Sequence, residues 1–184
     1  APSDSVLRWA VLFHDMGKPE CFALDTQGIG HFMGHGVVSR RIADGVMDRL
    51  RFDNDAKERI GELVEWHDHR VETEKGVRRM LNRFGERNFR YLLAIQRADN
   101  MGQAEKFRDR QKEIDRVEAM LDRELEKGSC FSLKQLAVNG NDLLGLGLSG
   151  PAVGRTLQGL LDRVMDGTLP NDRDALLTAA GKIR

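Results

Sequence analysis

The chain has 184 residues, enough for one sizeable domain or two small ones with a hydrophobic core that needs no disulfide staples. Hydrophobic residues make up 40% and charged residues 32%, as is typical of a globular protein with much helical surface. Lys plus Arg and Asp plus Glu number 29 each, which excludes a broadly basic protein, so any nucleic-acid surface has to be local.

The two cysteines, Cys21 and Cys130, lie far apart in the sequence and form no CxxC pair. This spacing argues against a disulfide framework or a zinc ribbon and favours a reducing, cytoplasmic setting. No uncharged apolar run approaches the roughly 18 residues that span a membrane, and no signal peptide is visible. We therefore expect a cytoplasmic protein without a membrane partner, beginning either at a processed terminus or as a fragment.

The first expected element is a helix in the segment Leu7–Lys18, LRWAVLFHDMGK. Its apolar residues recur at helical spacing and predict one buried face, formed by Val6, Trp9, Ala10 and Phe13. A short oxygen-bearing side chain among residues 3–5 can cap the start. We expect Gly17 to end the helix in the left-handed conformation and Pro19 to prevent it from resuming.

His14 and Asp15 stand at the end of this helix, where a buried face meets a cleft or the surface. An imidazole nitrogen beside a carboxylate oxygen is a plausible beginning of a divalent-metal site. The alternative is a histidine at the edge of the core, satisfied by a neighbouring acid. The doublet alone leaves both interpretations open.

Residues 20–34 contain turn-forming residues and are expected to form a loop. A helix is expected over residues 35–52, with an inward stripe of Val38, Ile42, Val46 and Leu50, widened by Val37, Ala43 and Met47. Asp53 or Asn54 then caps a further helix that runs to His67, with Ile60, Leu63 and Val64 facing inward. This spacing places His67 at the core or in a cleft within it.

A short basic helix is expected over residues 74–84, ended by Gly85, with an inward face of Val77, Met80, Leu81 and Phe84. Arginines gather in and after it: Arg78, Arg79, Arg83, Arg87 and Arg90. They form either an ordinary solvated face or a patch that faces phosphates, because guanidinium pairs with phosphate in a two-pronged manner. Both interpretations remain open.

An apolar helix is expected over residues 88–101, with Asp99 near its end. A carboxylate so close to an apolar face is costly unless it is paired or bound to a metal, so Asp99 is a reasonable partner for His14 and Asp15. A long charged helix over residues 104–127, with a narrow stripe of Ile114, Val117, Leu121 and Leu125, is assigned no chemistry.

The composition changes after Gly128 and Ser129, with fewer charges and more Leu and Gly. Two helices are expected around a glycine turn, the first capped by Asn139, the turn allowed by Gly145 and Gly147, and the second starting at residues 149–151. A last helix is expected over residues 172–183. Such a hairpin can present backbone amides to phosphates, although an ordinary helical hairpin would have the same sequence pattern.

Taken together, the motifs HDMGKP, GHFMGH, His67 and the RAD of residues 97–99 resemble the HD superfamily of phosphohydrolases. They are most similar to the HD-type region of bacterial tRNA nucleotidyltransferases, the CCA-adding and poly(A) polymerase family. The stretches FSLKQLAVNGNDLLGLG and GPAVGRTLQGLLDRVMDGTLPN are the more specific signal, because generic HD hydrolases lack them. The resemblance covers nearly the whole chain.

The resemblance implies an all-α fold, with an HD-type helical bundle at residues 1–127 and a smaller helical tRNA-binding tail at residues 128–184. It implies a divalent metal of the Mg, Mn, Ni or Fe class held by His14, Asp15 and Asp99. It assigns catalytic roles to His35, His67 and Lys18. The implied RNA contacts, with tRNA as the partner, are Arg78, Arg79, Lys134, Asn139, Gly140, Gly150, Gly154 and Arg155.

The sequence departs from the family pattern at its start. No histidine precedes His14, so we expect the first metal ligand and its helix to lie upstream of Ala1. The nucleotidyltransferase head, through which nucleotides would bind, is likewise expected upstream, and this chain alone is not expected to polymerise nucleotides. Three functions remain open: part of a tRNA nucleotidyltransferase, a free-standing metal phosphohydrolase acting on nucleotides or cyclic phosphodiesters, and a helical scaffold in which His14, Asp15 and Asp99 are scattered.

Overall fold

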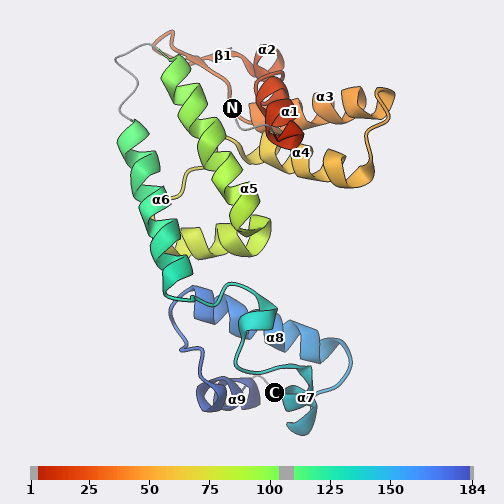
Figure 1. The fold of residues 1–184 in the computed structure, drawn as a ribbon, viewed down its shortest axis with the longest axis vertical. Helices are drawn as coiled ribbons and strands as arrows, with labels where there is room; N and C mark the ends of the chain where they lie inside the picture. Colours follow the sequence, from red (N-terminus) through yellow and green to blue (C-terminus); the bar gives the residue numbers. More distant parts are fainter. Residues whose placement is uncertain (1–3, 104–109, 183–184) are drawn as a thin grey trace. The chain divides into compact units, whose positions relative to one another are not determined.

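The structure, a computed structural model, describes residues 4–103 and 110–182. These residues form helices and one small antiparallel sheet, which confirms the all-α prediction (Figure 1). They divide into two compact units. Unit 1 comprises the described residues of 1–70 and 86–115, and unit 2 those of 71–85 and 116–184. The predicted boundary after residue 127, between an HD-type bundle and a tRNA-binding tail, stays a prediction.

Unit 1 begins with α1 (Ser5–Phe13), α2 (Lys18–Cys21) and the strands β1 (Ala23–Leu24) and β2 (Gly30–His31). It continues with α3 (His35–Arg49) and α4 (Asn54–Trp66). The second part of α5 (Glu74–Gly102) and the first part of α6 (Arg110–Glu126) complete it. Both α1 and α3 pack against α4 (Figure 1).

The first helix forms largely as its sequence predicts. The Asp4 carboxylate accepts hydrogen bonds from the amides of Val6 and Leu7, which caps α1. The prediction that Gly17 ends this helix in the left-handed conformation was wrong. α1 ends at Phe13, and Gly17 has a φ of −83° and precedes α2, whose first turn contains Pro19. Proline suits that position because the first turn of a helix leaves its amides unpaired.

The buried face of α3 differs from the expected apolar stripe. It is formed by His35, Ser39, Ala43 and Met47, whereas Val37 and Leu50 are exposed. The reason is a close approach: the Gly17 amide donates to Ser39 Oγ over 2.8 Å, in a buried position. Gly17 and Ser39 are small enough to allow this approach, so the face of α3 that carries Ser39 turns inward.

Residues 20–34 are not a simple loop, because α2 and a short hairpin lie within them. The strands pair Ala23 with His31 and Leu24 with Gly30. The expected turn chemistry is present, since Asp25 Oδ1 accepts from the amides of Gln27 and Ile29.

The middle helices follow their sequence patterns. Asp53 caps α4 through the Ala56 amide, and Ile60, Leu63 and Val64 are buried. α5 is interrupted at Gly85, whose φ of 67° and ψ of 170° break the helix where a break was expected. The start expected for the long charged helix, residues 104–109, lies outside the described residues.

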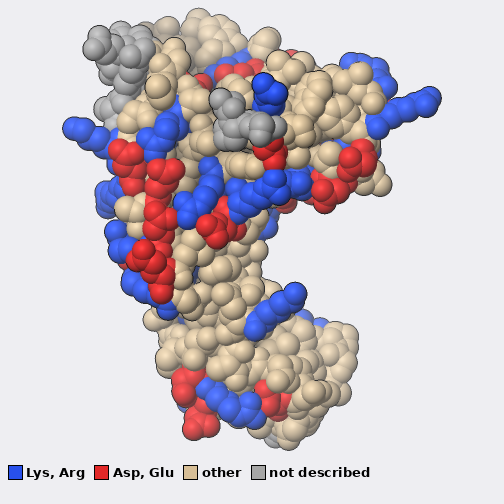
Figure 2. Space-filling view, viewed as in Figure 1, with Lys and Arg blue, Asp and Glu red and all other residues tan. Residues whose placement is uncertain are grey.

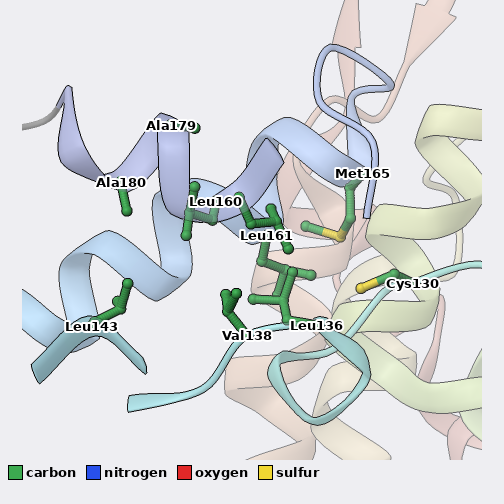
Figure 3. Packing of buried hydrophobic residues seen from close by; sticks show 10 residues of the cluster. Cys130, Leu136, Val138, Leu143, Leu160, Leu161, Met165, Ala179 and Ala180 are labelled. Atoms are coloured by element: carbon green, nitrogen blue, oxygen red, sulfur yellow. The ribbon is translucent and has the colours of Figure 1, made fainter. Parts of the chain in front are cut away.

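Unit 2 contains the 3₁₀ turn η2 (Leu133–Gln135), α7 (Gly140–Gly145), α8 (Pro151–Met165) and α9 (Arg173–Gly181), with parts of α5 and α6. Its core gathers side chains from Cys130 onward around Leu143, Leu160 and Leu161, and these three leucines are fully buried (Figure 3). Asn139 caps α7 as predicted, in a reciprocal capping box with Asp142. None of the described helices has the length and apolar character that crossing a bilayer requires.

A candidate histidine–aspartate metal centre

Side chains from separate segments of unit 1 meet around Asp15. His14 and His67 follow the ends of α1 and α4, His35 begins α3, and Asp99 lies near the end of α5. Asp15 Oδ2 lies 3.2 Å from His14 Nε2 and 2.6 Å from Lys18 Nζ. Asp15 Oδ1 lies 3.4 Å from His35 Nε2 and 3.7 Å from His67 Nε2.

Asp99 completes this group, because its Oδ1 lies 3.9 Å from His14 Nε2. The six residues that the sequence singled out for metal binding and catalysis are therefore neighbours. These distances contradict the scattering of His14, Asp15 and Asp99 that a helical scaffold without chemistry would predict. The roles of the individual residues remain predictions.

The three histidine rings are held in the same way. Each Nδ1 donates to a backbone carbonyl three residues earlier: His14 to Val11 over 2.7 Å, His35 to Phe32 over 2.8 Å and His67 to Val64 over 2.7 Å. A carbonyl can only accept, so each Nδ1 carries the hydrogen and, in a neutral ring, each Nε2 presents a lone pair. Metal-binding histidines are oriented by this kind of bond.

The Nε2 atoms face one another in a way that calls for a cation. The Nε2 atoms of His35 and His67 are 3.0 Å apart, and two lone pairs at that distance repel unless a proton or a metal ion relieves them. His14 Nε2 and Asp15 Oδ1 are buried and make no hydrogen bond with the described residues. Ligand atoms of His14, Asp15 and His67 lie within 4.8 Å of one another. Imidazole and carboxylate ligands sit about 2.0–2.2 Å from a transition metal, so the donor set fits one such ion.

The electrostatics of the cluster also favour a cation. Burial lowers the pKa of His14, but the adjacent carboxylates of Asp15 and Asp99 outweigh burial and raise it to about 10. Burial raises the pKa of Asp15, but His14 and Lys18 outweigh this effect and hold it below its ordinary value. Burial lowers the pKa of His67. At neutral pH the metal-free site therefore has anionic carboxylates, a protonated His14 and a neutral His67, and a metal ion that binds His14 would displace the proton from its Nε2.

A cavity of about 360 Å³ opens beside the cluster. His35, His67 and Asp99 form part of its wall, together with Lys18, Arg70 and Arg110. A cavity that joins metal-binding groups to basic side chains suits a phosphate-containing ligand.

Two close backbone approaches bring the cluster together. A Cβ atom on Gly17 would lie 2.6 Å from His35 O, and one on Gly36 would lie 2.5 Å from Glu65 O. Both distances are far below ordinary contact, so only glycine lets these segments meet. The role of Gly17 differs from the predicted helix stop, and no role was predicted for Gly36, although the glycines on both sides of His35 are a signal in the sequence for a close approach there.

Arg78 and Arg79, two of the arginines expected to face phosphates, have protein partners within unit 2. Arg78 donates through Nε to Met165 O over 2.7 Å and through Nη1 to Glu124 over 2.9 Å. Arg79 donates to Asp166 over 3.0 Å. On the described surface drawn in Figure 2, acidic and basic side chains are interspersed and do not form a broad basic face.

The other predicted RNA contacts lie around α7 and α8 in unit 2. Asn139 and Gly140 begin α7, and the Asn139 side chain accepts from the Asn141 amide. Gly150 precedes α8, while Gly154 and Arg155 are exposed near its start. Lys134 is exposed in η2, which packs against α8.

The all-α fold and the histidine–aspartate cluster define a helical protein with a candidate phosphate site. The family model described as tRNA nucleotidyltransferase domain 2, putative, matches residues 35–180. The chain therefore belongs to the tRNA nucleotidyltransferase family, as its sequence predicted. The matched range includes His35, His67 and Asp99 but begins after the His14–Asp15 doublet.

Curated relatives agree with this assignment. The chain is 33% identical over 172 residues to a CC-adding tRNA nucleotidyltransferase of Thermus thermophilus, an alignment covering 91% of this chain and 38% of the relative. It is 38% identical over 66 residues to an A-adding tRNA nucleotidyltransferase of Deinococcus radiodurans, covering 35% and 15% of the two chains. It is 46% identical over 50 residues to a CCA-adding enzyme of Limosilactobacillus fermentum, covering 27% and 12%. The chain thus spans less than half of each relative, and no solved structure matches it.

Proposed function

We propose that this chain is the tRNA-binding part of a tRNA nucleotidyltransferase and holds tRNA while a separate head adds nucleotides to its 3′ end. The observation that carries this proposal is the family match over residues 35–180. The names of the relatives support tRNA as the partner, since they are described as CC-adding, A-adding and CCA-adding.

The start of α8 is the candidate contact with the tRNA backbone. Pro151 has no amide hydrogen, and the amides of Ala152 and Val153 donate to Ser149 O and Gly150 O over 3.3 and 3.2 Å, so the positive end of the helix dipole, and not a free amide, would attract a phosphate here. Arg155 lies exposed on the next turn and can pair with phosphate in a two-pronged manner. Such contacts recognise the shape and backbone of tRNA without reading its sequence, which agrees with the balanced overall charge.

Binding of a tRNA lacking its terminal nucleotides, measured over a salt series, tests this proposal. Arg155→Ala should weaken binding about tenfold, because one phosphate contact is lost. The slope of the logarithm of the binding constant against the logarithm of salt concentration should fall in magnitude by about one. Arg163→Ala is the matched control, since it removes an exposed arginine from the opposite end of α8. Equal affinity and equal salt dependence of the two variants would count against the proposal.

We further propose that the histidine–aspartate cluster is a divalent-metal site for phosphoester hydrolysis. The observation that favours it is the convergence of His14 Nε2 with the carboxylates of Asp15, at 3.2 Å, and Asp99, at 3.9 Å. His14, Asp15 and Asp99 would hold an ion of the Mg, Mn, Ni or Fe class. When bound, such an ion polarises a phosphoryl oxygen and lowers the pKa of a coordinated water.

The remaining residues of the site have roles that follow from their positions. His35 and His67 line the cavity and can accept or return a proton at Nε2. Lys18 Nζ neutralises Asp15 and also lies at the cavity wall, where it can pair with a phosphate oxygen.

Hydrolysis of a 2′,3′-cyclic nucleotide by the chain loaded with Mn²⁺ or Ni²⁺ tests this second function. Asp99→Asn should lower both the number of bound ions and the rate. A wild-type chain that binds metal but hydrolyses neither cyclic nor linear phosphodiesters would contradict the hydrolytic role and leave a binding role. A chain that hydrolyses these substrates but does not bind tRNA would instead favour a free-standing phosphohydrolase.

A further inference from the structure

Arg110, the first residue of α6, lies in the wall of the cavity beside the cluster, and part of its hydrogen-bonding capacity is not satisfied by the described residues. Its side chain is only 17% exposed. Its Nε is buried and has no hydrogen-bond partner among the described residues. Among the described residues its Nη1 pairs with Asp68, at 3.5 Å, and that carboxylate is itself largely exposed. Leaving the buried Nε–H without an acceptor is costly, so this arrangement indicates a ligand that supplies one.

Arg70 lines the same cavity and is exposed, and no described residue pairs with it. Lys18, in contrast, is held by Asp15 at 2.6 Å and belongs to the cluster. The two guanidinium groups therefore form a second basic region of the cavity, separate in its pairing from the metal-binding residues. Guanidinium matches the geometry of phosphate oxygens better than that of other common ligands.

Two apolar side chains line the cavity directly after the hairpin strand β2, next to His31. Phe32 and Met33 line it and are 38% and 85% exposed, and the Phe32 ring lies 5.5 Å from that of Phe22. An exposed aromatic ring beside basic groups is the combination that proteins use to hold single-stranded nucleic acid, with a base stacked on the ring and the backbone on the cations. A volume of about 360 Å³ is in the range of small-ligand pockets.

We propose that this cavity receives the 3′ end of a single-stranded RNA, with Arg110 and Arg70 binding a phosphate one nucleotide away from the group at the cluster. Phe32 stacks on a base of the same segment. This inference rests on the proposed hydrolytic function of the cluster, and it adds a specificity for substrates with at least two phosphates. Arg110 is accordingly a specificity-determining residue.

Two substrates that differ by one nucleotide distinguish binding of a second phosphate by Arg110 from a general effect of Arg110 on catalysis. Adenosine 2′,3′-cyclic phosphate has one phosphate, and adenylyl-adenosine 2′,3′-cyclic phosphate has two. Arg110→Gln should raise KM for the dinucleotide about 10- to 100-fold, the effect of losing a charged hydrogen bond, with kcat within twofold. KM for the mononucleotide should change by less than about threefold. Arg110→Lys should give an intermediate KM because lysine keeps the positive charge but cannot form the two-pronged hydrogen-bond pair of a guanidinium.

Arg49→Gln is the matched control, since it removes an exposed arginine at the end of α3 that does not line the cavity. It should leave both KM values unchanged. Equal losses on both substrates in Arg110→Gln, or no loss on either, would overturn the subsite.

Calorimetric binding of adenylyl-adenosine 3′-phosphate to the metal-free chain distinguishes failure of the subsite from failure of the hydrolytic function. If neither cyclic substrate is hydrolysed, the proposed hydrolysis fails. The subsite then still predicts that this ligand binds the wild type and Arg49→Gln equally and Arg110→Gln at least tenfold more weakly. A wild type that does not bind it, or an Arg110→Gln chain that binds it as well as the wild type, would overturn the subsite.

Discussion

Gly17→Ala should disturb the metal centre without touching any of its ligands. The added Cβ would lie 2.6 Å from His35 O and from Ser39 N, and 2.9 Å from Val38 Cβ, whereas ordinary contact begins at 3.4 Å. Two of these atoms belong to the backbone of α3 and cannot rotate away. Ordinary contact needs about 0.8 Å more than the 2.6 Å available, so the segment carrying the His14–Asp15 doublet must move away from α3 by most of that distance.

The expected cost is about 1–3 kcal/mol of unfolding free energy, the usual penalty for overpacking. For a unit of this size it corresponds to a fall of at least about 4 °C in melting temperature. The displacement also moves His35 away from Asp15, so affinity for Mn²⁺ should fall at least about tenfold, as it does when supporting residues of metal sites are changed.

Thermal unfolding followed by circular dichroism, together with calorimetric titration of Mn²⁺, measures both effects. Gly45→Ala is the matched control, because nothing lies within 4 Å of its added Cβ in the middle of α3. It should stabilise the helix by about 0.5–1 kcal/mol and leave metal affinity unchanged. The reasoning is refuted if Gly17→Ala melts and binds Mn²⁺ like the wild type.

Further predictions concern the second close approach, the buried ion pair of unit 2 and metal linkage. Gly36→Ala should weaken Mn²⁺ binding at least about tenfold by calorimetry, because its Cβ would lie 2.5 Å from Glu65 O and part α3 from α4. Arg78→Met should lower the urea-derived unfolding free energy of unit 2 by about 3 kcal/mol, because the 1%-exposed Glu124 loses its partner at 2.9 Å and keeps only the more distant Lys127 Nζ, at 3.5 Å, among the described cations. The double variant with Glu124→Gln should recover much of this loss, and no recovery would contradict the explanation. Burial raises the pKa of Glu124, but Arg78 and Ser129 outweigh burial and hold the pKa below its ordinary value of 4.5. The stabilisation that Glu124 provides is therefore complete above pH 4.5 and is lost as the pH falls through the folded-state pKa. Between about pH 6 and pH 3, the urea-derived unfolding free energy should change less with pH in Glu124→Gln than in the wild type. Mn²⁺ at 100 times its Kd should stabilise unit 1 by about 2.7 kcal/mol in thermal unfolding, and a chelator should remove this gain.

Much of the fold could be predicted because its signals are local. The Asp53 and Asn139 caps and the break at Gly85 each depend on residues within one turn of the position concerned. The cost of a carboxylate beside an apolar face suggested Asp99 as a partner for His14 and Asp15, and the family resemblance assigned the three to one metal site. No local rule brings residues so far apart in the chain to one point.

What the sequence could not show depends on contacts between distant segments. The inward face of α3 could not be read from its apolar pattern, because Ser39 is buried by a hydrogen bond from Gly17, 22 residues earlier. The arginine run was ambiguous for the same reason. Arg78 finds its acceptors 46 and 87 residues further on, at Glu124 and Met165, which no periodicity reveals.

Titration of the metal-free chain with Mn²⁺, followed by electron paramagnetic resonance, most directly tests whether His14, Asp15 and Asp99 form one metal site. We predict one tightly bound ion per chain, lost in Asp15→Asn and retained in Asp55→Asn, which changes an exposed carboxylate on α4. An absence of saturable binding in the wild type, or binding that survives Asp15→Asn unchanged, would contradict the assignment of the cluster as a metal centre.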